Sequence, residues 1–142
     1  MSKFDLYGKS PVPANKLRFI PESGTYPKGF SIGSIKAGIK PASSPQPDLV
    51  LVASDVPSCG AAVFTKNEFC APSVTVSRDI VRKTKGRGIR GVIANAGCAN
   101  LFTGKAGLQD TIKMGEEAAR YVAGGQKESS VLVMHTGAGG QR

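Results

Sequence analysis

The chain has few cysteines, one histidine and no long apolar run, and these shortages argue against several classes of protein. Its 142 residues include an odd number of cysteines without Cys-x-x-Cys spacing, Cys59, Cys70 and Cys98. They are typical of small buried residues in a reducing compartment, and favour neither a disulfide framework nor a zinc site. No apolar run approaches the length of about 20 residues that a membrane-spanning helix needs. We therefore expect no membrane partner, no metal and no cofactor.

Acidic residues are also scarce, with 10 against 19 basic ones, which gives a formal net charge of +9. Such a field attracts nucleic acid, anionic membranes or acidic small molecules. No aromatic residue is interleaved with the main basic cluster, so base stacking is not expected. We favour a soluble enzyme with a basic surface, and keep a basic anion- or nucleic-acid-binding module as the alternative. The cluster consists of Arg78, Arg82, Lys83, Lys85, Arg87 and Arg90.

The distribution of apolar runs predicts a single α/β domain after an irregular, Pro- and Gly-rich arm over residues 1–29. A short helix is predicted from Ser77, as its N-cap, to near Gly86. A longer helix is predicted up to Gly124–Gly125. Its apolar face is expected to contain Leu108, Ile112, Ala119 and Val122. Strands are predicted over residues 30–39, 48–53, 60–65 (as the hairpin partner of 48–53), 74–76, 89–95 and 131–134.

Glycine is concentrated at the end of the last predicted strand, over residues 135–140 (HTGAGG). Successive backbone N–H groups in such a turn can bind an anion or stabilise an oxyanion. The alternative is a tight strand exit that needs glycine only for its dihedral angles, and the residues alone favour that alternative. His135 is more often a polar strand-end residue than a catalyst. The amide-rich loop over residues 95–104 is equally ambiguous, because asparagine side chains hold substrates or stabilise turns.

One further motif resembles the nucleophile elbow of serine hydrolases. Gly29 to Gly33 matches Gly-x-Ser-x-Gly, and Ser31, Asp110 and His135 follow the chain order of such a triad. The elbow needs a strand before the serine and a helix after it. Here a proline-containing turn precedes Ser31 and a strand-like run follows, so we interpret the match as chance.

Seven segments together resemble the bifunctional ornithine acetyltransferase family of arginine biosynthesis, especially its fungal members. They occur in the order and spacing of that family and extend over most of the chain after residue 20. One such segment alone would be a weak indication, whereas the ordered set is strong. The segments cover residues 24–30, 61–67, 71–74, 88–92, 95–100, 103–104 and 132–137.

The resemblance implies an αββα sandwich with mixed sheets, of which residues 1–142 would form an incomplete part. In that family, a precursor cuts itself between alanine and threonine, and the freed threonine carries acetyl from N-acetylornithine to glutamate. The family's oxyanion-hole pair maps onto Thr136 and Gly137. The implied partner is a complementary β-type chain. The implied location is the mitochondrial matrix in a eukaryote, or otherwise the cytoplasm.

The sequence departs from the family pattern at several points. Residues 135–140 read HTGAGG where the family usually has Ser-Thr-Gly-Val-Ile-Gly, and Ala96 replaces a usual serine. No Ala-Thr pair occurs in the 142 residues. We therefore expect a truncated chain with an oxyanion-hole half-site, no nucleophile and no activity alone. We also expect apolar surface around Leu49, Val63 and Val92, and hence self-association.

Overall fold

The computed structural model of the chain describes residues 27–122 and 131–140. Most of the expected arm over residues 1–29, and the helix end at Gly124–Gly125, lie outside the described residues. None of the described helices is long and apolar enough to cross a membrane. Within the described part, the elements are β1 (Phe30–Ile35), β2 (Leu49–Ser58), α2 (Pro72–Thr84), β3 (Ile89–Cys98), α3 (Gly104–Val122) and β4 (Val131–Ala138).

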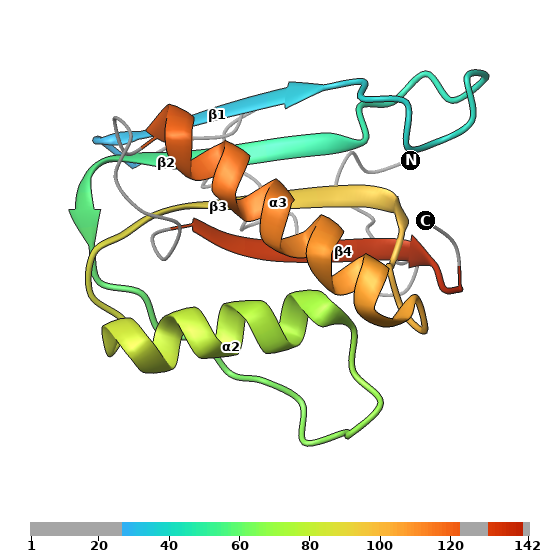
Figure 1. Cartoon of the computed structure of the whole chain (residues 1–142). Coiled ribbons are helices and arrows are strands. Elements are labelled where there is room, and N and C mark those ends of the chain that lie inside the picture. The colour runs from blue at the N-terminus through green and yellow to red at the C-terminus, as the bar shows by residue number, and fades with distance from the viewer. Residues whose placement is uncertain (1–26, 123–130, 141–142) are drawn as a thin grey trace, which may run out of the picture.

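The four strands form one mixed sheet in the order β1-β2-β3-β4 (Figure 1). Neighbouring strands are antiparallel between β1 and β2 and between β2 and β3, and parallel between β3 and β4. A parallel pair needs a crossover connection, and α3 supplies it across the face of the sheet. The α/β class and the mixed sheet predicted from the sequence are therefore confirmed.

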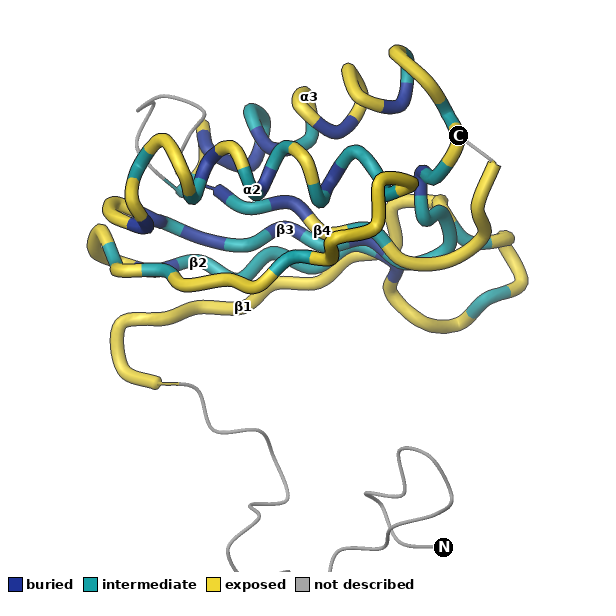
Figure 2. Tube along the Cα trace, turned by 90° about the horizontal axis from the view of Figure 1, so that it is seen from below, coloured by how far each residue is buried: buried dark blue, intermediate teal, exposed yellow. Residues whose placement is uncertain are grey.

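Both helices lie on the same side of the sheet (Figure 2). Between them and the strands lies a small core of Ile93, Val131 and Val133 with alanines of α3. Side chains alternate along a strand, so the residues next to Ile93, Val131 and Val133 in each strand point to the opposite face of the sheet. That face carries Ile32, which is 44% exposed. An apolar sheet face is therefore uncovered within the described residues, and self-association through it remains a prediction.

Helix α3 packs on the sheet through small residues rather than through the predicted apolar face. Leu108 and Ile112 are 37% and 40% exposed, whereas Thr111 and Gly115 are buried. A Cβ atom on Gly115 would lie 3.0 Å from Val133 Cγ2. The close approach of helix to strand therefore selects small side chains, and the face predicted from hydrophobicity is wrong for Leu108 and Ile112.

Two predicted strands are absent from the described structure. Residues 74–76 belong to α2, which begins at Pro72, and Ser77 is an internal residue rather than the N-cap. Proline is well suited to the first turn of a helix, and packing overrides the β propensity of valine and threonine there. Residues 60–65 have no strand partner, because β2 is paired with β1 and β3 instead.

Candidate functional site

The carboxyl ends of β3 and β4 meet at one edge of the sheet, since the two strands are parallel. Helix α3 also begins at this edge (Figure 1). In α/β sheets, ligands bind in the crevice beyond the carboxyl ends of the strands. Thr136 and Gly137 lie at this end of β4, and both are exposed. The sequence predicted that a turn begins at residue 135, and this start is wrong, because β4 continues to Ala138.

Gly137 is pressed against the backbone of β3. Its φ angle is +127°, and a Cβ atom there would lie 2.3 Å from the carbonyl carbon of Gly97 and 2.6 Å from the nitrogen of Cys98. The ladder is irregular at this point, because Cys98 pairs with both Thr136 and Ala138. Position 137 therefore requires glycine for two reasons, the positive φ angle and the close contact with β3. These constraints hold the end of β4 in one geometry.

Backbone hydrogen bonds extend this attachment into the next loop. The Ala99 N–H donates to the Ala138 oxygen over 2.8 Å, and the Gly140 N–H donates to the Leu101 oxygen over 2.7 Å. The strand end is therefore a preorganised segment, which is the property that an oxyanion hole needs.

Thr136 lines a cavity of about 310 Å³ together with Asp48 and Ala96. Asp48 is 2% exposed, and its carboxylate accepts three backbone N–H bonds, from Ala37 at 2.6 Å, Ile39 at 2.8 Å and Lys40 at 2.9 Å. The Lys40 bond, with the other two, holds the pKa of Asp48 below its ordinary value. This carboxylate therefore fixes the loop beside the cavity.

His135 connects three elements beside the candidate site. Its Nδ1 contacts Asn95 Oδ1 on β3, and its Nε2 lies 3.0 Å from the Thr111 hydroxyl on α3. The Asn95 amide nitrogen donates to the Cys98 oxygen over 2.9 Å, so its Oδ1 faces the ring and Nδ1 carries the proton. Burial lowers the pKa of His135. The ring is therefore a neutral structural link between β3, β4 and α3, and it lies within β4 rather than at the strand end.

The asparagines of the loop at 95–104 stabilise it from within. Asn100 is 4% exposed, and its amide nitrogen donates to the Gly107 oxygen over 2.8 Å and to the Thr111 hydroxyl over 2.9 Å. Its Oδ1 accepts from the Thr103 hydroxyl over 2.6 Å. Of the two roles considered from the sequence, the structure supports turn stabilisation.

The serine-hydrolase arrangement is excluded by the sheet order. Ser31 lies on β1 and His135 on β4, at opposite edges of the four-stranded sheet. Three strand spacings separate them, or about 14 Å. A strand also occupies residues 30–35, where the elbow would need a helix to begin.

The basic cluster is divided between structural and exposed residues. Arg90 donates to the backbone oxygens of Ser54 at 3.0 Å and Val122 at 2.9 Å. Arg78 donates to the Thr65 oxygen at 3.3 Å, and its guanidinium lies 5.7 Å from the Phe64 ring centre. The remaining members are exposed at the end of α2 and the loop after it: Arg82, Lys83, Lys85 and Arg87.

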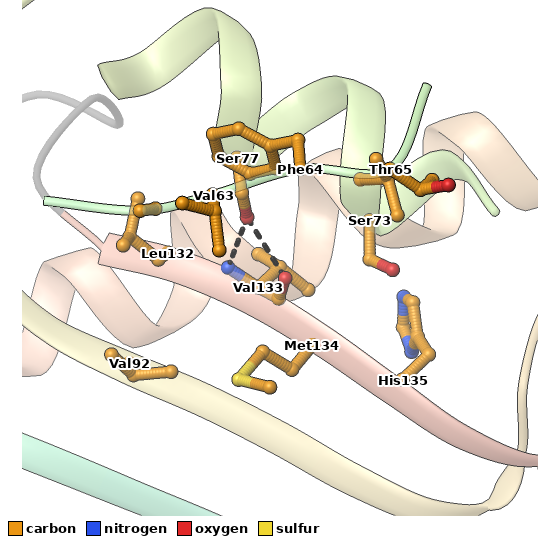
Figure 3. Close-up of a pocket in the computed structure, with 12 residues that line it drawn as sticks. Val63, Phe64, Thr65, Ser73, Ser77, Val92, Leu132, Val133, Met134 and His135 are labelled. Carbon is orange, nitrogen blue, oxygen red and sulfur yellow. Dashed lines mark hydrogen bonds between the residues drawn. The ribbon is translucent and has the colours of Figure 1, made fainter. Parts of the chain in front are cut away.

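A second, open cavity of about 350 Å³ is lined by residues of β4, of α2 and of the extended segment 62–65 (Figure 3). Ser73, a buried residue that is 5% exposed, is part of this lining. Sequence reasoning missed this serine, because it assigned the neighbouring residues to a strand. Pro72 before it, a residue common in the first turn of helices, was the available signal.

Comparison with known proteins agrees with the fold and the motifs. The chain matches the ArgJ family over residues 31–142. It is 61% identical over 146 aligned positions to the arginine biosynthesis bifunctional protein ArgJ 2, mitochondrial, of Sclerotinia sclerotiorum, covering 99% of this chain and 30% of that protein. It is 52% identical to the mitochondrial ArgJ protein of Neurospora crassa, covering 92% of this chain and 27% of the relative.

Solved structures show the same architecture. The ornithine acetyltransferase of Mycobacterium tuberculosis, in complex with ornithine, aligns with a TM-score of 0.71 at 36% identity, covering 82% of this chain and 60% of that one. The ArgJ protein of Bacillus halodurans aligns with a TM-score of 0.71 at 33% identity, covering 80% of this chain and 56% of that one. The present chain spans 27–30% of the length of these two curated relatives. By its family match, its close relatives and its fold, the chain belongs to the ArgJ family.

Proposed function

We propose that this chain forms the amino-terminal part of an acetyltransferase of arginine biosynthesis, which transfers acetyl from N-acetylornithine to glutamate. Family membership supports the reaction class, and the names of the fungal relatives support a mitochondrial location. The bound ornithine of the Mycobacterium tuberculosis structure supports a small amino-acid substrate.

The observation that carries the proposal to particular residues is the packing of Gly137 against the Gly97–Cys98 peptide. Acyl transfer passes through a tetrahedral intermediate whose oxyanion needs fixed hydrogen-bond donors. Thr136 and Gly137 are exposed, and they belong to a strand end that the next loop holds in place. In this proposal the donors to the oxyanion would be the side-chain hydroxyl of Thr136 and the backbone N–H of Gly137.

The nucleophile would come from outside these 142 residues. The family resemblance assigns it to a threonine freed by cleavage of an Ala-Thr bond, and the sequence contains no such pair. A complementary β-type chain is therefore the proposed partner, and the 142-residue chain alone would not turn over.

Substitution of Thr136 in a reconstituted enzyme tests the assigned site. The chain would be co-expressed with the remaining part of the Sclerotinia sclerotiorum relative, and acetyl transfer would be measured. Thr136→Ala should lower kcat by about 10²–10³-fold, the usual effect of removing one oxyanion donor, with little change in KM. Ser31→Ala, on the far strand β1, is the control and should keep full activity. Full activity of Thr136→Ala would refute the assignment of this residue.

A further inference from the structure

A series of polar groups connects the beginning of α3 with the end of β4. Each member lies within hydrogen-bonding distance of the next, and the three central amide and hydroxyl side chains are buried. Buried polar networks of this kind hold their members in one arrangement when every group is satisfied. In order, the members are Thr103, Asn100, Thr111, His135, Asn95 and the Cys98 oxygen.

The donors and acceptors fix the direction of these bonds around the ring. The Asn95 amide nitrogen donates to the Cys98 oxygen over 2.9 Å, so its Oδ1 accepts the proton on His135 Nδ1. In a neutral ring, Nε2 is then an acceptor. The Thr111 hydroxyl, 3.0 Å away, is the group that can donate to it.

The Thr111 hydroxyl has one hydrogen and two acceptors within reach. Besides Nε2 of His135, the Gly107 oxygen lies 2.8 Å from it. The Gly107 oxygen also accepts from the Asn100 amide over 2.8 Å, whereas among the described residues Nε2 has no other donor. The hydrogen therefore satisfies the ring, and each member of the series donates to the next, from Thr103 to the Cys98 oxygen.

The last bond of the series lies at the candidate site. The peptide group between Cys98 and Ala99 is held on both sides, because its oxygen accepts from Asn95 and its N–H donates to the Ala138 oxygen over 2.8 Å. Gly137 packs against the nitrogen of the same Cys98, at 2.6 Å from a Cβ atom built on it. The series therefore constrains the strand end on both sides of Gly137.

We propose that His135 is a positioning residue for Thr136 and Gly137, acting through Asn95. The Nδ1 proton orients the Asn95 amide, the amide holds the peptide after Cys98, and this peptide fixes the end of β4. The ring exchanges no proton with substrate, because both of its nitrogens are already bonded. This role rests on the function proposed above, in which Thr136 and Gly137 stabilise the oxyanion.

The position of the ring proton tests the direction of the series without any measurement of activity. His135 is the only histidine of the 142 residues, so ¹⁵N NMR of the histidine-labelled chain reports on this ring alone. Magic-angle spinning tolerates self-association. Above the ordinary histidine pKa of 6.5, we expect the proton on Nδ1 and an unprotonated Nε2. A proton on Nε2 instead would reverse the Asn95 amide and overturn the proposal.

Two substitutions of His135 test positioning in the reconstituted enzyme. His135→Asn keeps an N–H donor near the place of Nδ1, whereas His135→Leu is of similar size and has no donor. His135→Leu should lower kcat by about 10–10²-fold with little change in KM, since a misplacement of about 1 Å has effects of this order. His135→Asn should retain most of the wild-type kcat.

A purely structural role of His135 predicts a different result. Both variants lose the bond to Thr111, so both would melt at lower temperature while the folded enzyme kept its kcat. Unchanged kcat in His135→Leu, or equal losses in the two variants, would overturn the proposal.

Thr136→Ala separates this proposal from the function on which it rests. Loss of activity in Thr136→Ala together with full activity in His135→Leu would refute the positioning role alone. Full activity in both variants would refute the oxyanion assignment, and the positioning role with it. Loss of kcat in both, with recovery in His135→Asn, is the expected result.

Discussion

The Ser77 hydroxyl on α2 bonds both backbone polar groups of Val133 on β4. It donates to the Val133 oxygen over 2.8 Å and accepts from the Val133 N–H over 2.9 Å. A strand at the edge of a sheet normally presents such groups to another strand. Here a helix side chain takes the place of a neighbouring strand, which closes the centre of the outer β4 edge to further pairing.

Removal of this hydroxyl should destabilise the fold. Ser77→Ala leaves the buried N–H and C=O of Val133 without their partner, and each lost partner costs about 1–3 kcal/mol. We expect a lower unfolding midpoint in urea with an unchanged slope. Ser43→Ala, at an exposed loop position, is the matched control and should be neutral. Equal stability of Ser77→Ala and wild type would contradict the edge-closing role.

Two glycines near the end of β4 should respond differently to an added methyl group. Gly137→Ala would place a Cβ atom 2.3 Å from Gly97 at a φ of +127°, and backbone strain alone costs about 1–3 kcal/mol. Gly139→Ala meets only Leu101, at an ordinary 3.6 Å, and should change stability by less than about 0.5 kcal/mol. Thermal denaturation of both variants checks this, and similar losses in the two would argue against the close packing of Gly137.

The buried Asp48 carboxylate predicts a loss of stability in acid. Three N–H bonds, first that from Lys40, lower its folded pKa below the ordinary value of 3.8. As the pH falls, the carboxyl group takes up a proton in the unfolded chain before it does so in the folded chain. The stability that Asp48 contributes is therefore present above about pH 3.8 and is lost as the pH falls from there to the folded pKa. Asp48→Asn should lower stability near neutral pH and flatten this acid dependence. An unchanged acid profile in the variant would be inconsistent with the assigned role.

His135 predicts a second pH dependence, closer to neutrality. Burial lowers its folded pKa below the ordinary value of 6.5, so the unfolded state binds the proton first as the pH falls. Stability is therefore greatest above 6.5 and decreases until the pH reaches the folded pKa. His135→Gln, which cannot titrate, should remove this decrease in melts across the range. A histidine ring titration at or above 6.5 by NMR would contradict the lowered pKa.

The class of fold and most strands could be predicted, because β3 and β4 are apolar runs whose length and flanking glycines indicate buried strands. The start of α2 could not, since Val74 and Thr75 favour strands locally and only packing on β4 makes them helical. The packed face of α3 could not be predicted either. Gly115 and Thr111 lie on it because the helix approaches Val133 closely, and hydrophobic periodicity contains no information about that distance.

The candidate site was located in the sequence by resemblance rather than by residue chemistry. Thr136 and Gly137 are small residues in a glycine-rich stretch, and nothing local distinguishes a catalytic strand end from a structural one. The contact of Gly137 with Gly97 joins segments 40 residues apart and becomes visible only in the folded chain. Ser73 was missed for a similar reason, since its buried position depends on β4 and on residues 62–65.

Acetyl transfer from N-acetylornithine to glutamate is the most direct test of the proposed function. It would be measured for the purified 142-residue chain alone and after co-expression with the remaining part of the Sclerotinia sclerotiorum relative. The proposal predicts turnover only in the reconstituted enzyme, because Thr136 and Gly137 supply one half of a site whose nucleophile lies on the partner. Turnover by the chain alone above background would contradict it.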